Sequence, residues 1–236
     1  MTDTIKLTID GVEITARKGQ QIIEAAEENG IYIPRLCFMK GLTPAGACRV
    51  CTVMVNGRPQ ASCTQPAADG MVVLNDTPEL GEWRKSVVEM LFSEGNHFCM
   101  FCELSGNCEL QATAYRLGIA SSRHAYQFPQ RRVEASHPDL YLDGNRCILC
   151  GRCARAAQEL DGKTVFGFLG RGHHTRLSFN ADSLGTTELK ALDKAASACP
   201  VGCILRKRVG FAKPIGARLY DHHPIGAEVD AKRAAK

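Results

Sequence analysis

Alternating apolar and polar residues at the start of the chain predict two β-hairpins. Leu7 and Ile9 alternate with polar neighbours, and residues 10–11 (Asp-Gly) are the kind of two-residue turn that joins antiparallel strands. The run over residues 52–55 leads in the same way into an Asn-Gly turn at residues 56–57. We therefore expect a strand on each side of both turns.

A short helix and a further strand complete this first unit. Residues 21–29 carry apolar side chains at helical spacing, and Gly30 follows them as a C-terminal stop. Residues 71–74 are the last predicted strand. Two hairpins, one helix and a cysteine-rich loop between them are typical of a β-grasp ferredoxin fold.

Helical spacing of apolar residues also predicts a long helix over residues 78–94, opened by a proline. Its apolar face includes Trp83, which we expect to pack in the core. A second helix is predicted to begin near Cys108. Residues 118–140 have no clear period and are interpreted as irregular.

These elements predict an α+β protein with three small domains. The expected boundaries are residues 1–77 for the ferredoxin-type domain, 78–118 for a small helical domain, 119–139 for a linker, and 140–236 for a C-terminal ferredoxin-like domain with a tail. The last nine residues of the tail are rich in Ala and Lys, and we expect them to fray.

Cysteine gives the chain its candidate chemistry. The chain has 12 cysteines, and eleven of them, with one histidine, form three consecutive sets of four. Thiolates and an occasional imidazole hold iron–sulfur clusters, so each set is a candidate cluster site. The sets are Cys37, Cys48, Cys51 and Cys63; His97, Cys99, Cys102 and Cys108; and Cys147, Cys150, Cys153 and Cys199.

The first set has the spacing C-x10-C-x2-C-x11-C. Plant-type ferredoxins have four residues between the first two cysteines, so this site is ferredoxin-like but not of the photosynthetic kind. Gly41 and Gly46 would let backbone N–H groups approach the cluster. Zinc is the alternative that the spacing leaves open, because C-x2-C pairs also bind zinc.

The second set has the compact spacing H-x-C-x2-C-x5-C. A lone histidine is usually a surface or core residue. His97, however, stands two residues before a cysteine pair in a set that lacks a fourth cysteine, so we interpret it as a ligand. A neutral imidazole in place of a thiolate leaves less negative charge and should raise the reduction potential of the cluster.

The third set combines a C-x2-C-x2-C run with a distant Cys199 that is followed by proline. In the bacterial C-x2-C-x2-C-x3-C-P run, the fourth cysteine serves a second cluster. Ala157 stands at that position here, which predicts one [4Fe–4S] cluster rather than two. The remaining Cys203 is interpreted as a free buried thiol, and replacement of Cys199 or His97 as a ligand is its alternative role.

Composition limits the other classes of function. The formal net charge is +4, and clusters of the usual oxidised charges, about −2, −1 and −2, bring it close to zero. Two short basic stretches, 130–132 and 206–208, have few aromatic neighbours, so nucleic-acid binding is not expected. The sequence shows no secretion signal and no apolar stretch of membrane-spanning length. We therefore expect a cytoplasmic protein with reduced thiols, neither a disulfide scaffold nor a membrane protein.

Motifs for other cofactors are missing from the sequence. No G-x-G-x-x-G follows a predicted strand, no P-loop is present, and no cysteine pair resembles a nickel site. We expect neither NAD, FMN nor nickel to bind to this chain. The histidine pairs at residues 173–174 and 222–223 lack a further donor and are interpreted as inert.

Six segments carry a resemblance to a known family, namely residues 95–99, 105–111, 146–153, 170–172, 207–211 and 214–216. With the three cysteine sets, they resemble the N-terminal part of the large iron–sulfur subunit of respiratory complex I. The same architecture occurs in some formate dehydrogenases and iron-only hydrogenases. In length and tail the chain is more similar to the small diaphorase (gamma) subunit of soluble NAD-reducing [NiFe]-hydrogenases.

This resemblance implies an electron-transfer subunit of an oxidoreductase, with no substrate site of its own. It implies one [2Fe–2S] cluster in the first set and a [4Fe–4S] cluster in each of the others. The implied partners are the small and large [NiFe]-hydrogenase subunits and an FMN/NAD(H)-binding diaphorase subunit. Two alternatives remain, an equivalent relay in an NAD-dependent formate dehydrogenase or complex I-like enzyme, and a zinc-stapled interaction module without a redox role.

Overall fold

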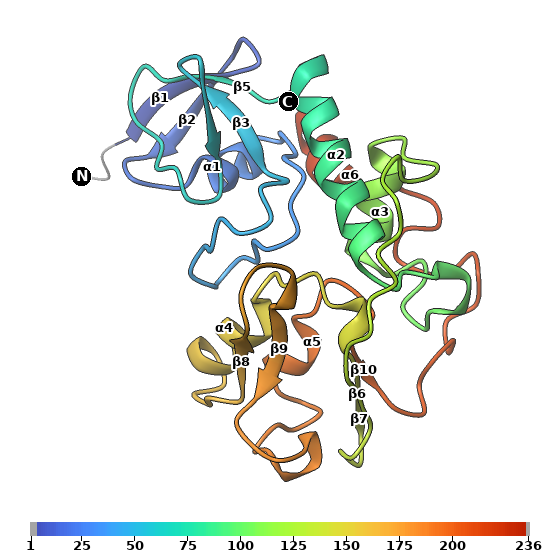
Figure 1. The fold of residues 1–236 in the computed structure, drawn as a ribbon. Helices are drawn as coiled ribbons and strands as arrows, with labels where there is room; N and C mark the ends of the chain where they lie inside the picture. Colours follow the sequence, from blue (N-terminus) through green and yellow to red (C-terminus); the bar gives the residue numbers. More distant parts are fainter. Residues whose placement is uncertain (1–3, 235–236) are drawn as a thin grey trace.

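The computed structural model describes residues 4–234 and shows an α+β protein, as the sequence predicts. Figure 1 shows a first unit built on a β-sheet, a group of helices beside it, and a third unit of short strands and helices below. The chain leaves the first unit through α2 (Pro78–Glu94) and ends in α6 (Ala227–Ala234). The described C-terminal end thus returns toward the first unit.

Five strands form the sheet of the first unit in the order β2-β1-β5-β3-β4. Both predicted hairpins are present, because the residues of the two turns adopt the positive φ angles that such turns require. β5 runs parallel to β1 and antiparallel to β3, which joins the hairpins into one sheet. The elements are β1 (Thr4–Ile9), β2 (Val12–Arg17), β3 (Thr52–Val55), β4 (Arg58–Ala61), β5 (Val72–Leu74) and α1 (Ile22–Glu28).

The sheet and α1 enclose a hydrophobic core of their own, which we call the first core. Its members come only from the first unit and include Cys51 and Cys63. Two of the four predicted ligands of the first set are therefore anchored inside the sheet unit. The largest fully buried side chains of this core are Leu7, Ile9, Ile22, Ile23, Ile33 and Val53.

Helix α2 spans the predicted residues, and α3 (Glu109–Arg116) follows near the predicted start. Thr77 caps α2, since its side chain accepts a hydrogen bond from the Leu80 N–H. Leu80 is buried but Trp83 is 38% exposed, so the prediction that Trp83 packs in the core is wrong. Arg84 is buried instead, and its guanidinium donates hydrogen bonds to oxygens of the first unit. A polar anchor therefore holds part of the inner face of α2.

The third unit contains a three-stranded sheet in the order β10-β7-β6 and a separate β8-β9 hairpin. Its first strand, β6, lies within the predicted linker, so the end of that linker contributes to the sheet. The elements are β6 (Val133–Glu134), β7 (Leu140–Asp143), α4 (Arg152–Glu159), β8 (Phe166–Leu169), β9 (Arg176–Phe179), α5 (Lys194–Ser197) and β10 (Ile204–Arg206).

A second, larger core, called here the shared core, joins the three parts of the molecule. It contains residues of the third unit, Val88 of α2 and Leu110 of α3. It also contains Leu36, Cys37 and Val50 from the loop of the first unit. This loop therefore packs against the other units, while the first core consists only of residues of the first unit.

The C-terminal segment does not fray in its described part, contrary to the prediction. Val229 of α6 is buried in a small cluster with Tyr32 and Ala112. Arg116 of α3 pairs with Asp230 of α6 at 2.8 Å. An apolar stripe and an ion pair thus hold α6 against the first unit and α3. The last two residues of the predicted fraying stretch lie outside the described residues.

Candidate iron–sulfur sites

The structure brings the four cysteines of the first set together. The Cys37 N–H donates to Cys48 Sγ at 3.4 Å, and the Cys48 N–H donates to Cys37 Sγ at 3.5 Å. The thiols of Cys51 and Cys63 are hydrogen-bonded to each other, and Cys63 also contacts Cys37. Four thiols from one loop and two strand ends therefore form one group.

These contacts shift the pKa values of the four thiols in opposite directions. Hydrogen bonds from Cys48 and Cys63 lower the pKa of Cys37, and a hydrogen bond from Cys63 lowers the pKa of Cys51 to about 7. The same contacts raise the pKa values of Cys48 and Cys63. Since the thiolate is the form that binds metal, mutual contact of the four thiols favours charged sulfur within the group.

The first site lies at the boundary between the two cores. Cys37 belongs to the shared core, whereas Cys51 and Cys63 belong to the first core. The loop between Cys37 and Cys48 turns through Gly41 and Gly46, with φ angles of 88° and 62° that favour glycine. The approach of backbone N–H groups to a cluster at these glycines stays a prediction.

The second set forms a compact site between α2 and α3. Its donors line one small cavity together with Arg146 and Gly202 from the third unit. Arg146 donates to Cys102 Sγ at 3.7 Å, which places a positive charge against a candidate ligand. The four donors are His97, Cys99, Cys102 and Cys108.

The imidazole of His97 fits an iron ligand better than a core residue. Its Nε2 is buried and has no hydrogen-bond partner among the described residues, although buried polar atoms normally have one. Burial, with the nearby charges of Arg146 and Arg131, lowers the pKa of His97 to about 4. The ring is therefore neutral near pH 7, which is the form that binds metal.

The third set gathers around the loop that precedes α4. This loop reverses direction through Leu149 and Gly151, which have φ angles of 54° and 70°. The Leu149 N–H donates to Cys147 Sγ at 3.4 Å. Burial raises the pKa of Cys150 to about 12 and also raises that of Cys153. The four thiols that lie close enough to influence one another are Cys147, Cys150, Cys153 and Cys199.

The structure adds a fifth thiol to the third site. Cys203 is buried, as predicted, but its thiol is in hydrogen-bonding contact with Cys147 and Cys199. These contacts lower the pKa of Cys147 and bring that of Cys199 to about 7. Gly202, and not Cys203, lines the cavity of the second site. In the sequence, the C-x3-C spacing of Cys199 and Cys203 is the signal that could have indicated their proximity.

One short segment, residues 199–203, contacts both the second and the third site. Its two cysteines lie at the third site, while its Pro200 carbonyl accepts a hydrogen bond from Cys108 Sγ at 3.6 Å. A Cβ on Gly202 would lie 2.6 Å from Cys102 Sγ, so the backbone passes directly against the second site. The two sites are therefore neighbours that share a wall.

Two arginines of α4 link the third site to the others. Arg155 donates to the carbonyl oxygens of Cys37 and Cys150, at 2.6 and 3.2 Å. Arg152 donates to both carboxylate oxygens of Glu109, beside the second site, at 2.6 and 2.9 Å. The site that comes last in the sequence thus contacts both of the other two.

All twelve cysteines are free thiols in the structure, so no disulfide competes for them. Within residues 4–234, no group of three or more His, Cys, Asp or Glu side chains is arranged to hold a single metal ion. The four protein ligands of a cluster are divided over two or four irons, so they need not converge on one point. The donor types and their grouping therefore fit clusters.

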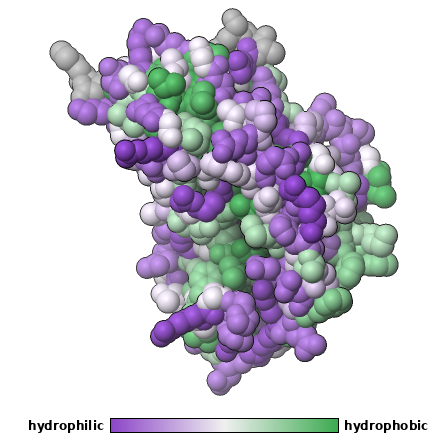
Figure 2. Space-filling view, turned by 45° about the horizontal axis from the view of Figure 1, so that its top comes forward, coloured by the Kyte–Doolittle hydropathy of each residue, from purple (hydrophilic) through white to green (hydrophobic). Residues whose placement is uncertain are grey.

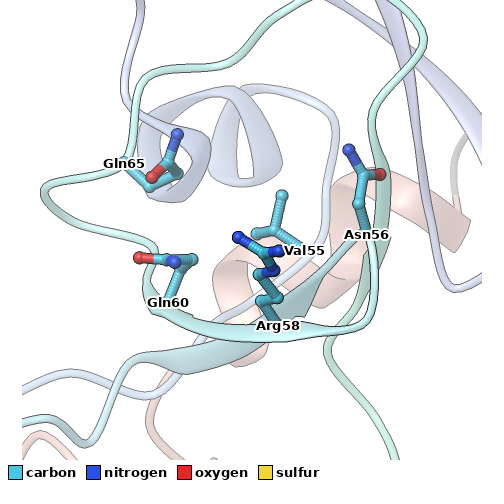
Figure 3. A pocket seen from close by; sticks show the side chains of 5 residues that line it. All are labelled: Val55, Asn56, Arg58, Gln60 and Gln65. Atoms are coloured by element: carbon cyan, nitrogen blue, oxygen red, sulfur yellow. The ribbon is translucent and has the colours of Figure 1, made fainter.

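A further cavity lies apart from the cysteines, in the first unit. Figure 3 shows its lining from the β3-β4 hairpin and the segment after it. The cavity has a volume of about 410 Å³, and it contains one charged side chain and no thiol or imidazole. It therefore offers no ligand for iron. The lining residues are Val55, Asn56, Arg58, Gln60 and Gln65.

Comparison with known proteins supports the same division of the chain. A 2Fe-2S iron-sulfur cluster binding domain matches residues 2–78. An NADH-ubiquinone oxidoreductase-G iron-sulfur binding region matches residues 84–123, and a 4Fe-4S single cluster domain matches residues 140–205. The chain therefore carries a 2Fe-2S domain followed by 4Fe-4S-binding regions.

A full-length relative decides the family. The NAD-reducing hydrogenase HoxS subunit gamma of Cupriavidus necator is 40% identical over 225 residues, which cover 95% of this chain and 96% of that protein. The chain belongs to the gamma-subunit family of NAD-reducing hydrogenases. A chain in the crystal structure of an NAD+-reducing [NiFe]-hydrogenase in the H2-reduced state matches this gamma-family fold with a TM-score of 0.93. The match has 47% identity and covers 97% of this chain and 98% of that one.

More distant relatives of this gamma-family chain confirm the resemblance to complex I. The mitochondrial NADH-ubiquinone oxidoreductase 78 kDa subunit of Candida albicans is 34% identical over 89% of the chain, but only 30% of that protein is covered. The NADPH-Fe(3+) oxidoreductase subunit alpha of Geobacter sulfurreducens is 33% identical over 88% of the chain and is covered to 24%.

Between residues 4 and 234, no helix has both the length and the apolar character to cross a membrane.

Proposed function

We propose that this chain is the iron–sulfur electron-transfer subunit of an NAD-reducing [NiFe]-hydrogenase. The observation that carries the proposal is the grouping of twelve candidate donors into three adjacent sites, with the third site in contact with each of the others. Family membership and the match to a hydrogenase structure support it. When bound, iron–sulfur clusters accept and release single electrons, while the protein sets their spacing, potential and insulation.

We assign the clusters as the sequence predicts. Cys37, Cys48, Cys51 and Cys63 would hold a [2Fe–2S] cluster; His97, Cys99, Cys102 and Cys108 would hold a [4Fe–4S] cluster; and Cys147, Cys150, Cys153 and Cys199 would hold a second [4Fe–4S] cluster. These sites belong to proposed domains at residues 1–77, 78–118 and 140–236, with residues 119–139 as the linker. Because proline follows Cys199, as in the ferredoxin run, we assign Cys199 as the ligand and Cys203 as a hydrogen-bond donor to ligand sulfurs.

The proposed partners are the small and large [NiFe]-hydrogenase subunits and an FMN/NAD(H)-binding diaphorase subunit, in the cytoplasm. Exposed apolar side chains around the second site and the tail support burial in a hetero-oligomer. Figure 2 shows hydrophobic residues gathered near the middle of one face, between hydrophilic regions. The most exposed apolar side chains near the second site and in the tail, between 61% and 84% accessible, are Phe98, Met100, Phe101, Phe128, Phe211, Ile215 and Leu219.

An equivalent relay in a formate dehydrogenase or complex I-like enzyme is the second candidate. The gamma subunit in Cupriavidus necator is 40% identical over 225 residues, whereas the complex I relative in Candida albicans is 34% identical over 215 residues. The higher identity therefore favours the hydrogenase. Proteins that co-purify with the chain would separate the two candidates.

Reconstitution tests the proposal. The complex, purified anaerobically, should be brown and contain about ten irons attributable to this chain, against none for a zinc module. A complex lacking this subunit should lose hydrogen-dependent NAD reduction while its hydrogenase subunits still reduce an artificial dye. An iron-free chain that still supports hydrogen-dependent NAD reduction would refute the proposal.

A further inference from the structure

The side chain of Arg155 lies at the junction between the first and third sites. Its guanidinium donates hydrogen bonds to the carbonyl oxygens of Cys37 and Thr43 at 2.6 Å each, and to that of Cys150 at 3.2 Å. Cys37 is a proposed ligand of the first site and Cys150 is one of the third. One side chain therefore bonds to a ligand residue of each site.

Helix α4 holds this guanidinium in place. The Arg155 N–H bonds to the carbonyl of Gly151 at 3.1 Å, so the helix backbone fixes where the side chain starts. One turn further, a Glu159 carboxylate oxygen accepts a hydrogen bond from the Thr43 N–H at 2.7 Å. Both backbone polar groups of Thr43 are thus bonded to α4. The loop of the first site is clasped by the helix of the third.

Other arginines near the sites make different contacts. Arg146 donates to Cys102 Sγ in the second site, and Arg131 donates to the Cys147 carbonyl in the third. Within residues 4–234, Arg155 is the arginine whose hydrogen bonds reach ligand carbonyls of two different sets. The hydrogen bonds of Arg155 therefore connect the first and third sites, whereas Arg146 and Arg131 each contact a ligand residue of one site.

We propose that Arg155 is a positioning residue that couples the first and third sites for electron transfer. The inference rests on the proposed function, because it requires a cluster at each site. One electron is exchanged, so one site is oxidised as the other is reduced, and no proton or covalent bond is transferred. The guanidinium completes a bonded path between the Cys37 and Cys150 backbones, and its positive charge stabilises the reduced, more negative form of both sites.

The test is Arg155→Gln in the assembled complex, with potentials followed by EPR during redox titration. The first and third clusters should become harder to reduce, by about tenfold in the reduction equilibrium, or ~59 mV for one electron. The second cluster should keep its potential. Electron exchange between the first and third clusters, followed by rapid-freeze EPR, should be slower. Arg155→Lys keeps the charge but not the fork of donors, so it should restore the potentials and leave exchange slow.

Two matched variants test whether the effects of Arg155→Gln come from its hydrogen bonds to the Cys37 and Cys150 carbonyls, which we call the bridge. Arg171→Gln removes a positive charge from an exposed position in the same unit and should change neither potentials nor exchange. Glu159→Ala releases the clasp on Thr43 without touching either ligand carbonyl. If Glu159→Ala slows exchange as much as Arg155→Gln does, loop anchoring explains the result and the bridge role is wrong.

Failure of this inference is distinguishable from failure of the proposed function. If the parent complex lacks the EPR signals and iron of three clusters, the proposed function fails. If Arg155→Gln keeps parent iron, potentials and exchange rate, the coupling role fails and the proposed function stands. If Arg155→Gln loses iron, Arg155→Lys decides, since slow exchange in a fully loaded variant supports the role and parent exchange overturns it.

Discussion

The first unit and the remainder of the molecule hold their candidate sites in different ways. The sheet unit has its own core and supplies Cys51 and Cys63 from it. The second and third sites have no separate cores, because α2, α3 and the third unit contribute to the shared core. The difference teaches that the first site is held in part by its own unit and in part by the shared core, while the other two sites depend on the shared core.

The content of regular secondary structure explains this division. A five-stranded sheet packed on a helix buries enough apolar surface to form a core without help. The helical unit is short, and the third unit consists of short strands and helices joined by irregular segments, so both gain stability from cross-links such as metals or partners. Residues 199–203 provide such a cross-link, because this segment contributes to the third site and packs against the second.

The largest effect that we expect is from removing one ligand of the third site. Cys150→Ser should lose the third cluster, about four irons, and weaken the second site through the shared core. Cys51→Ser should lose only the first cluster, because its surroundings belong to the first core. Iron analysis, EPR and thermal unfolding would measure this. Equal damage to all three sites in both variants would contradict the comparison.

A smaller change in the shared wall should also damage the second site. Gly202→Ala would place a methyl group 2.6 Å from Cys102 Sγ, which the backbone can relieve only by moving. We expect a loss of about 1–3 kcal/mol in unfolding free energy and a reduced second-cluster EPR signal. Gly167→Ala is the matched control, since no atom lies within 4 Å of its new Cβ. An unchanged second-cluster EPR signal in Gly202→Ala would show that the backbone of residues 199–203 can move without disturbing the second site.

The fifth thiol should make the third site tolerant of one substitution. In Cys199→Ala, Cys203 lies close enough to take over as ligand, so the third cluster should persist with an altered potential. The double variant Cys199→Ala, Cys203→Ala should lose that cluster. Cys203→Ala alone should keep the cluster but lower its potential, since a hydrogen bond to ligand sulfur is removed. A parent potential in Cys203→Ala would count against its proposed role.

The smallest structural effect is expected from exchanging the imidazole ligand. His97→Cys should keep the second cluster assembled and lower its potential, on the order of 100 mV, because a thiolate adds negative charge. Potentiometric EPR measures the shift, and thermal unfolding should be nearly unchanged. His97→Ala should lose the cluster, which serves as the control for ligation. A potential that stays or rises in His97→Cys would argue against His97 as a ligand.

Local chemistry made the elements and the donor sets predictable, but not their arrangement in space. The turn residues at 10–11 and 56–57 fix both hairpins, because few residue pairs accept their backbone angles. The exposure of Trp83 and the burial of Arg84 depend on what packs against α2, which periodicity does not specify. The contacts of Cys203 depend likewise on long-range packing. The contacts of the third site with the other two join residues that are 43, 92 and 118 positions apart in the chain, which local patterns do not specify.

Because the site encoded last contacts both of the others, loss of the gene segment that encodes it would remove contacts that hold the remaining two sites. A descendant without the C-terminal unit would keep the first two sets of donors but would lose one wall of the second site and the helix that anchors the loop of the first. We therefore expect evolution to transmit the three units as a single block, which agrees with distant relatives that retain nearly the whole of this length within much longer proteins.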